Sequence, residues 1–362
     1  MRRITRRQFM KQVGAAGAAT AIPTLLIRRA EAAWSPGSRL HPNVDDLRVV
    51  GVTDPSMTRP GIPATWSGQE SRVQREAVWA NLDRLACTLA ATRPARDAWR
   101  ALFVKPPGRA WADTTVAVKT NQIGRQHARS AVVSRVCRAL VEDVGVRPSS
   151  IHIYDACHGG DMARETPFAH LPRGVRIEGD WGGSSAETRV PPIWPGGGTT
   201  RCLEPLVDGS VDILVNIAVC KGHSSRFGGF TMTMKNHFGT FSPGPGHGHA
   251  GFEYLLAVNQ SREILGPLDP KTGRVVAPRQ QLCVVDALWA SEDGPGCLPQ
   301  AQPNFLAMGV LSPAVDYVVA TAFRDGMMGW PVNREAADRM LEAFGYRPGD
   351  LPDRGCLIEP AP

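Results

Sequence analysis

Cationic and amide side chains are concentrated in one stretch, Cys220–Phe241, which reads CKGHSSRFGGFTMTMKNHFGTF. The apolar run before it, Val211–Val219, has the length and composition of a buried strand. Lys221 and His223 would therefore emerge where that strand ends, and Lys235 would follow shortly after. Side chains of these types can bind an anion, donate directional hydrogen bonds and transfer protons.

Lysine is the rare cation of this chain, with six residues against 35 arginines. A lysine ammonium is compact, its pKa falls readily on burial, and its amine can attack a carbonyl. Lys119, Lys221 and Lys235 all lie at or shortly after the ends of expected buried strands, which favours a chemical role for them. An arginine-favouring composition that leaves a few lysines by chance is the alternative explanation.

The N-terminus has the pattern of a twin-arginine export signal over residues 1–32. Paired arginines in TRRQFMK precede a weakly apolar, Gly- and Ala-rich stretch and then the small-residue site Ala30-Glu31-Ala32. An amphipathic first helix is the alternative. The pattern predicts a periplasmic or secreted protein that uses the twin-arginine translocation machinery. The apolar stretch is too short and Gly-rich to span a membrane comfortably, so we expect no stable span in the mature form.

The formal net charge of +7 is located mainly in that signal. Residues 1–32 carry seven cations against Glu31, a net charge of +6, which leaves +1 for the remainder. A basic groove for nucleic acid therefore has little support, and a basic stripe interleaved with aromatic residues is also missing. The hydrophobic content of 43% suits a soluble globular core.

Buried-strand and amphipathic-helix patterns alternate along the chain after the signal. The expected strands are Leu47–Thr53, Val116–Val118, Ile151–Tyr154, Val211–Val219, Gln281–Val285 and Phe305–Leu311. The expected helices are Ser71–Ala90, Arg129–Asp143, Glu253–Leu265, one that starts at Ser312-Pro313, and Arg334–Phe344. This alternation predicts an α/β fold with a mainly parallel sheet flanked by helices.

The same patterns suggest how the chain is divided. We expect a linker over residues 33–46, a single α/β domain over 47–350 and a loosely held tail over 351–362. A Gly- and Pro-rich stretch at about 156–205 has the composition of a long irregular insertion on the surface, placed where it could cover the site.

Polar side chains follow four of the expected strands. They are Lys119 and Asn121, Asp155 and His158, Lys221 and His223, and Asp286. In open α/β sheets ligands bind outside the carboxyl ends of the strands, so these groups could converge although they are far apart in sequence. Alternatively, they simply mark where strands leave the core.

Several of these motifs, in this order, resemble an uncharacterised family called domain of unknown function 362. They are Lys119-x-Asn121, Lys221-Gly222-His223, Thr231-x-x-x-Lys235-Asn236-x-x-Gly239, VVDA at residues 284–287 followed by Gly294-Pro295, and Ser312–Asp316. The resemblance covers about residues 116–322. It implies that Lys119, Asn121, Lys221, His223, Lys235, Asn236, Asp286 and Asp316 match the family pattern, and it implies no settled activity.

Some members of that family are joined to ferredoxin-type iron–sulfur modules, which would imply redox chemistry. This chain differs, because its eight cysteines are nowhere closer than fourteen residues apart. A cluster held by a local cysteine motif is therefore disfavoured. Disulfides are an open alternative for exported cysteines, and the sequence does not pair them.

We expect an exported enzyme with a Lys-, His- and Asn-lined cleft that binds a small anionic substrate. Lys221, His223, Lys235 and Asp286 are the candidate catalytic residues, and Lys119, Asn121, Asn236 and Asp316 are the candidate substrate-binding residues. A periplasmic metal- or cofactor-dependent redox protein and a non-catalytic ligand-binding protein are the alternatives.

The composition allows a metal ion as a cofactor, with His158, His247 and His249 as candidate ligands. His-x-His in a Gly-rich loop can present two imidazoles to one ion, although such loops are more often simply exposed to solvent. The sequence contains no H-E-x-x-H zinc motif, no phosphate-binding Walker loop, no G-x-G-x-x-G fingerprint after an expected strand and no serine nucleophile elbow.

Overall fold

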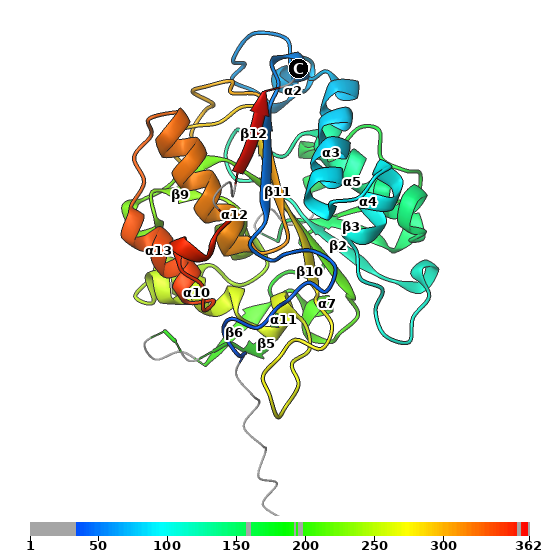
Figure 1. Cartoon of the computed structure of the whole chain (residues 1–362), viewed down its shortest axis with the longest axis vertical. Coiled ribbons are helices and arrows are strands. Elements are labelled where there is room, and N and C mark those ends of the chain that lie inside the picture. Colours follow the sequence, from blue (N-terminus) through cyan, green and yellow to red (C-terminus); the bar gives the residue numbers. More distant parts are fainter. Residues whose placement is uncertain (1–33, 157–160, 192, 195–197, 353–355, 361–362) are drawn as a thin grey trace, which may run out of the picture. The chain divides into compact units, whose positions relative to one another are not determined.

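The computed structural model describes residues 34–156, 161–191, 193–194 and 198–352, and the backbone alone of 356–360. The expected export signal and His158 lie outside the described residues. The centre of the described part is an eight-stranded sheet in the order β12-β1-β11-β10-β7-β2-β3-β4 (Figure 1). The strands are β1 (Val49–Thr53), β2 (Val116–Lys119), β3 (Ile151–Tyr154), β4 (Arg176–Gly179), β7 (Ile213–Val219), β10 (Gln280–Ala287), β11 (Phe305–Gly309) and β12 (Cys356–Pro360).

The pairs β1–β11 and β10–β11 are antiparallel, and every other neighbouring pair in this sheet is parallel. The predicted α/β fold with a mainly parallel sheet is therefore confirmed. Continuous apolar runs are typical of strands that are covered on both faces, and β7, for example, is buried along its whole length.

Helices cover both faces of the sheet (Figure 1). One face carries α3 (Arg75–Ala90), α4 (Ala95–Ala101) and α5 (Ser130–Arg138), and the other carries α8 (Thr233–Asn236), α10 (Gly251–Asn259), α12 (Ser312–Val318) and α13 (Arg334–Glu342). Strand residues alternate between the two cores, as strand geometry requires: Val116 and Val118 pack on the first face and Ala117 on the second. No helix among the described residues is long and apolar enough to cross a membrane.

Shorter elements complete the described part. They are the helices α2 (Trp66–Glu70), α6 (Met162–Glu165), α7 (Glu204–Val207), α9 (Gly244–His247) and α11 (Arg262–Leu265), and the two-stranded ribbons β5 (Ala186–Arg189) with β6 (Thr199–Cys202) and β8 (Lys221–Gly222) with β9 (Phe230–Thr231). Two helices continue as π-helices, α5 through Ala139–Val144 and α12 through Val319–Met327.

The insertion at 156–205 is more regular than its composition suggests. It contributes β4 to the main sheet and the β5–β6 ribbon, with glycines and prolines between these elements. The ribbon is anchored by polar contacts to the domain, because the Thr188 hydroxyl donates to buried Glu263 and the Thr200 hydroxyl lies 2.8 Å from the Tyr254 hydroxyl.

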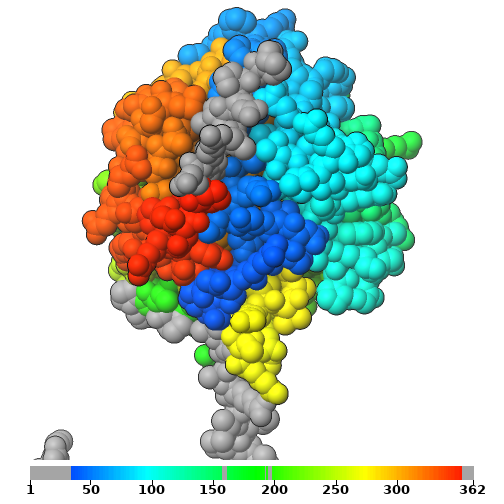
Figure 2. All heavy atoms as spheres, in the orientation of Figure 1, coloured from blue at the N-terminus to red at the C-terminus, as the bar shows by residue number. Residues whose placement is uncertain are grey.

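Both ends of the described chain are held by the domain. Trp34, in the expected linker, is only 5% exposed and its ring lies 4.9 Å from that of Phe344, so the start of the described chain lies beside the segment that follows α13 (Figure 2). The expected loose tail contains β12, whose backbone pairs in parallel with β1. A strand edge that would otherwise present unpaired backbone groups is thereby covered.

Candidate functional site

The sheet order places the carboxyl ends of β10, β7, β2 and β3 side by side. Lys119 ends β2, Asp155 follows β3, Lys221 follows β7, and Asp286 lies near the end of β10. Each of these four side chains is at most 1% exposed. They are thus part of a buried polar layer at one edge of the sheet, where α/β folds bind ligands.

Lys119 is held by three acceptors. Its Nζ atom lies 3.2 Å from Asp155 Oδ1 and 3.0 Å from Asn236 Oδ1, and it donates to the Thr120 carbonyl. The ring of Tyr154 lies beneath it, 5.9 Å away. An ammonium has three N–H groups, so this set of partners, which includes a carboxylate, suits a charged Lys119.

Lys221 has a different environment. Its Nζ atom donates to Asn121 Oδ1 over 2.7 Å and to the Ile123 carbonyl, both neutral acceptors. A neutral amine has two N–H groups and one lone pair. Two carbonyl-type acceptors therefore satisfy neutral Lys221 and leave its lone pair without a donor among these contacts.

Burial lowers the pKa of Lys221 from 10.5 to about 7. The Asp155 carboxylate opposes this shift, and the charges of Arg129 and Lys119 add to it. Desolvation disfavours the charged form of a buried amine, and nearby cations do the same. The two buried lysines thus differ in their partners, with a carboxylate beside Lys119 and only neutral acceptors on Lys221.

A chain of amides links the two lysines. Asn121 Nδ2 donates to Asn236 Oδ1 over 3.3 Å, and Asn236 Nδ2 donates to Asn216 Oδ1 over 2.9 Å. Asn216 lies within β7 and also donates to the Thr233 carbonyl over 2.8 Å. Asn216 was not among the residues expected from the sequence, although a single amide within the run ILVNIAV is a visible signal, because a buried amide needs partners.

Two glycines of the motifs lie where other atoms approach the backbone too closely for a side chain. A Cβ atom on Gly239 would lie 2.1 Å from Asp155 Oδ1 and 2.8 Å from Lys119 Nζ, so the Lys119–Asp155 ion pair packs directly on this glycine. A Cβ atom on Gly222 would lie 1.7 Å from the carbonyl oxygen of Glu292. These positions exclude any side chain.

The two candidate aspartates bind backbone groups. Asp316 accepts from Thr233 N over 2.8 Å, from Thr233 Oγ1 over 2.5 Å and from Met234 N over 2.9 Å, at the start of α8. Burial raises its pKa to about 6. Asp286 accepts from Arg129 N over 2.8 Å and from Leu288 N over 3.2 Å. Asp316 thus holds the helix that presents Asn236, and Asp286 holds the start of α5.

His223 and Lys235 belong to a second group, which we call the outer cation group and define as His223, Arg226, Lys235 and His247. Lys235 Nζ lies 3.1 Å from His247 Nε2 and 3.6 Å from the centre of the Phe238 ring. Partial burial lowers the pKa of His223 to about 4, and the charges of Lys235, His247 and Arg226 contribute. The structure therefore joins Lys119 to Lys221 through amides and groups His223 with Lys235.

The candidate metal ligands do not form a cluster in the described part. Among the described residues, no group of three or more His, Cys, Asp or Glu side chains is arranged to hold a metal ion. His247 contacts Lys235, and His249 is exposed. Where the thiols are described, they are free: Cys87, Cys137, Cys202, Cys220, Cys283 and Cys297.

Arg129 is a charged residue of this layer that was not expected from the sequence. It is 1% exposed, and its guanidinium lies 5.4 Å from the centre of the Trp289 ring. Its Nε and Nη1 atoms have no hydrogen-bond partner among the described residues. Burial lowers its pKa, and the charges of Asp286 and Glu70 oppose the shift. An arginine directly before a helix start gave no distinctive signal in an arginine-rich chain.

Comparison with known proteins gives one match. The model of the family described as "Domain of unknown function (DUF362)" matches residues 116–321. No curated protein and no solved structure matches this chain. The matched span contains β2, β3, β7, β10 and α8, with Lys119, Lys221, Asn236 and Gly239 at the positions described above. The chain therefore belongs to the DUF362 family of domains of unknown function.

Proposed function

We propose that this protein is an enzyme in which Lys221 acts as a general base on a small anionic substrate. The observation that carries this proposal is the contrast between the two buried lysines. Lys119 has Asp155 as a counter-ion, whereas the contacts of Lys221 are Asn121 and a backbone carbonyl. Pairs of titratable groups whose environments differ in this way are typical of acid–base sites.

A base works best when its pKa lies near the working pH. With a pKa of about 7, a substantial fraction of Lys221 is neutral at neutral pH and can accept a proton. The amide chain fixes the orientation of the amine, because Asn121 receives one of its N–H groups and is itself held by Asn236. Lys119 then supplies a fixed positive charge beside the base.

Arg129 supports an anionic substrate. A buried guanidinium normally has hydrogen-bond partners, and each exception calls for an explanation such as a ligand or an ion. The Nε and Nη1 groups of Arg129 are donors that a carboxylate or phosphate oxygen would satisfy. Arg129 is also close enough for its charge to act on Lys221, so a substrate bound to Arg129 would be near the base.

The test follows proton transfer directly. The purified full-length chain is incubated in deuterated water with small phosphorylated and carboxylated compounds, and conversion or deuterium incorporation is followed by NMR. We expect turnover that rises with pH through about 7 and that is lost in Lys221→Met, because the variant has no proton acceptor. Lys271→Met, at an exposed position, is the matched control and should retain full turnover.

Three results would contradict the proposal. Equal turnover by Lys221→Met and the unaltered chain would remove Lys221 from the chemistry. Compounds that bind with saturation but are neither converted nor exchanged would favour the ligand-binding alternative instead. Turnover that appears only after a metal ion is added would favour a metal-dependent reaction.

A further inference from the structure

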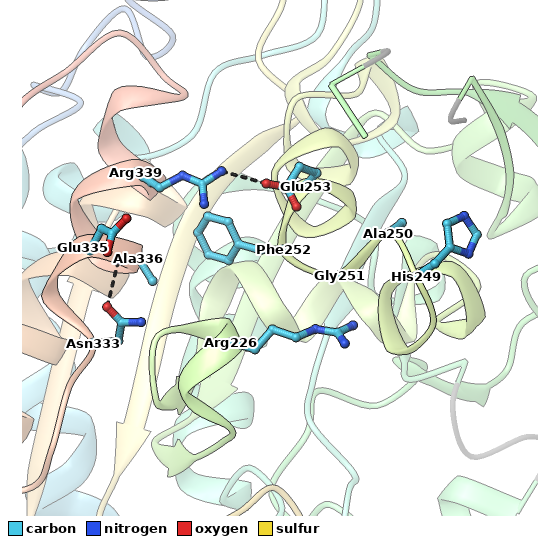
Figure 3. Close-up of a pocket in the computed structure, with 10 residues that line it drawn as sticks. All are labelled: Arg226, His249, Ala250, Gly251, Phe252, Glu253, Asn333, Glu335, Ala336 and Arg339. Carbon is cyan, nitrogen blue, oxygen red and sulfur yellow. Dashed lines mark hydrogen bonds and ion pairs between the residues drawn. The ribbon is translucent and has the colours of Figure 1, made fainter. Parts of the chain in front are cut away.

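A surface pocket of about 340 Å³ lies beside the outer cation group. Its lining includes Arg226, His249, Phe252, Glu253, Asn333 and Arg339 (Figure 3). Arg226 belongs to both the pocket and the outer cation group. The pocket lies on the α10 and α13 side of the sheet, and the proposed reaction makes no use of it.

Arg226 is the fixed cation of this pocket. Its Nη2 atom donates to the carbonyls of Gly246 and Gly248 over 2.6 and 2.9 Å, and its guanidinium lies 5.1 Å from the centre of the Phe227 ring. These contacts hold the guanidinium in place with neutral partners. Its charge also acts on His223 and His247, whose pKa values are lowered by burial and by the neighbouring cations. An anion bound at Arg226 would relieve this repulsion.

Two helices of nine residues begin at the pocket wall. Gly251, Phe252 and Glu253 form the first turn of α10, and no side chain caps that end. Asn333 is the N-cap of α13, and its side chain accepts from Ala336 N. The positive ends of both helix dipoles therefore face this region, which favours a negative group there.

The remaining charges of the pocket limit the charge of its ligand. Arg339 donates to Glu253 over 2.7 Å and lies 4.9 Å from the centre of the Phe252 ring, so this arginine is already paired (Figure 3). Glu335 also lines the pocket and is exposed. With Arg226 as the cation held only by neutral acceptors and with Glu335 nearby, one oxyanion group fits this pocket better than a polyanion does.

We propose that this pocket binds one oxyanion group, a phosphate or carboxylate, through Arg226 and the first turn of α10. The pocket does not depend on Lys221, so this inference stands or falls separately from the proposed reaction.

The test titrates inorganic phosphate and, separately, acetate into the full chain and measures binding by calorimetry. We expect saturable binding of at least one probe, and the tighter one identifies the class of group. Arg226→Gln should weaken binding by roughly tenfold, because a charge-assisted hydrogen bond is lost. Glu335→Gln should strengthen binding by about threefold, because it removes an exposed like charge.

Arg173→Gln is the matched control. It removes the same charge at an exposed position outside the pocket lining and should leave binding unchanged. The proposal is overturned if neither probe saturates, or if Arg226→Gln and Arg173→Gln weaken binding equally. Because Arg226 also holds the Gly246–Gly248 backbone, Glu335→Gln gives an independent answer: unchanged or weaker binding in that variant also contradicts the proposal.

Discussion

Two lysines that lie in the same buried layer differ in what surrounds them. Lys119 is bound by a carboxylate, an amide oxygen and a carbonyl, whereas Lys221 has two neutral acceptors. The difference arises because Asp155 lies against Lys119, on the backbone of Gly239. Contacts explain the spacing of the motif Lys235-Asn236-x-x-Gly239. The Asn236 amide binds Lys119, and Gly239 leaves room for the Lys119–Asp155 ion pair.

The pKa of Lys221 has a consequence for stability. Below about pH 7 the amine is protonated in both the folded and the unfolded chain, and the cost of burying its charge is fully present. Between about pH 7 and 10.5 the unfolded chain still holds the proton and the folded chain does not. The free energy of unfolding rises with pH wherever the unfolded chain binds more protons than the folded chain. In this pH range the cost of burying the Lys221 charge is therefore progressively relieved.

The free energy of unfolding should therefore rise with pH for the wild type relative to Lys221→Met, from about pH 7 to about pH 10.5. Denaturant unfolding of both proteins at several pH values measures this difference. Lys271→Met, at an exposed position, serves as the control and should give a flat difference. A flat difference for Lys221→Met as well would show that Lys221 keeps an ordinary pKa in the fold.

At the scale of elements, the site is formed by short elements whose positions are set by hydrogen bonds to residues that are distant in sequence. α8 has only four residues, and its start is bound by Asp316 of α12. Its Asn236 side chain reaches Asn216 of β7 and Lys119 of β2. Such a short helix is not stable by itself, so tertiary hydrogen bonds determine its position.

Gly239→Ala tests this packing. The new methyl group would overlap Asp155 Oδ1 and Lys119 Nζ, and breaking a buried ion pair is costly, so we expect a loss of about 3 kcal/mol in the free energy of unfolding. Gly349→Ala is the control, because a Cβ atom there meets nothing within 4 Å, and it should change the stability by less than about 0.5 kcal/mol. Equal stabilities of the two variants would mean that the layer can move aside at little cost.

The elements that the sequence predicted are those with long apolar patterns. The buried runs of β2, β3, β7 and β10 were found nearly complete, since continuous burial leaves a clear signal. β4 was missed because it has four residues and is only partly buried, and β12 was missed because it follows a Pro- and Gly-rich segment. Asn216 was missed although a single amide within a buried apolar run is a local signal. Arg129 depends on partners that are remote in sequence, so no local pattern could assign it.

At the scale of the whole molecule, we propose that the chain is exported in the folded state by the twin-arginine route. Changing Arg6 and Arg7 to Lys should keep the full-length protein in the cytoplasm, because the paired guanidinium groups are the recognised feature. Cell fractionation and detection of the chain measure this. Arg28→Lys with Arg29→Lys is a control that changes a second arginine pair of the same segment. Unchanged export in the Arg6 and Arg7 variant would refute the proposed route.

The protonation of Lys221 can be measured by NMR in the whole molecule, because the chain has only six lysines. With lysine labelled by 13C next to the amine, an NMR titration resolves these few signals, and Lys221→Met identifies the one of interest. We predict that the Lys221 signal titrates at about pH 7, well below the ordinary range for lysine. A Lys221 signal that titrates only in the ordinary range for lysine would contradict its role as a base.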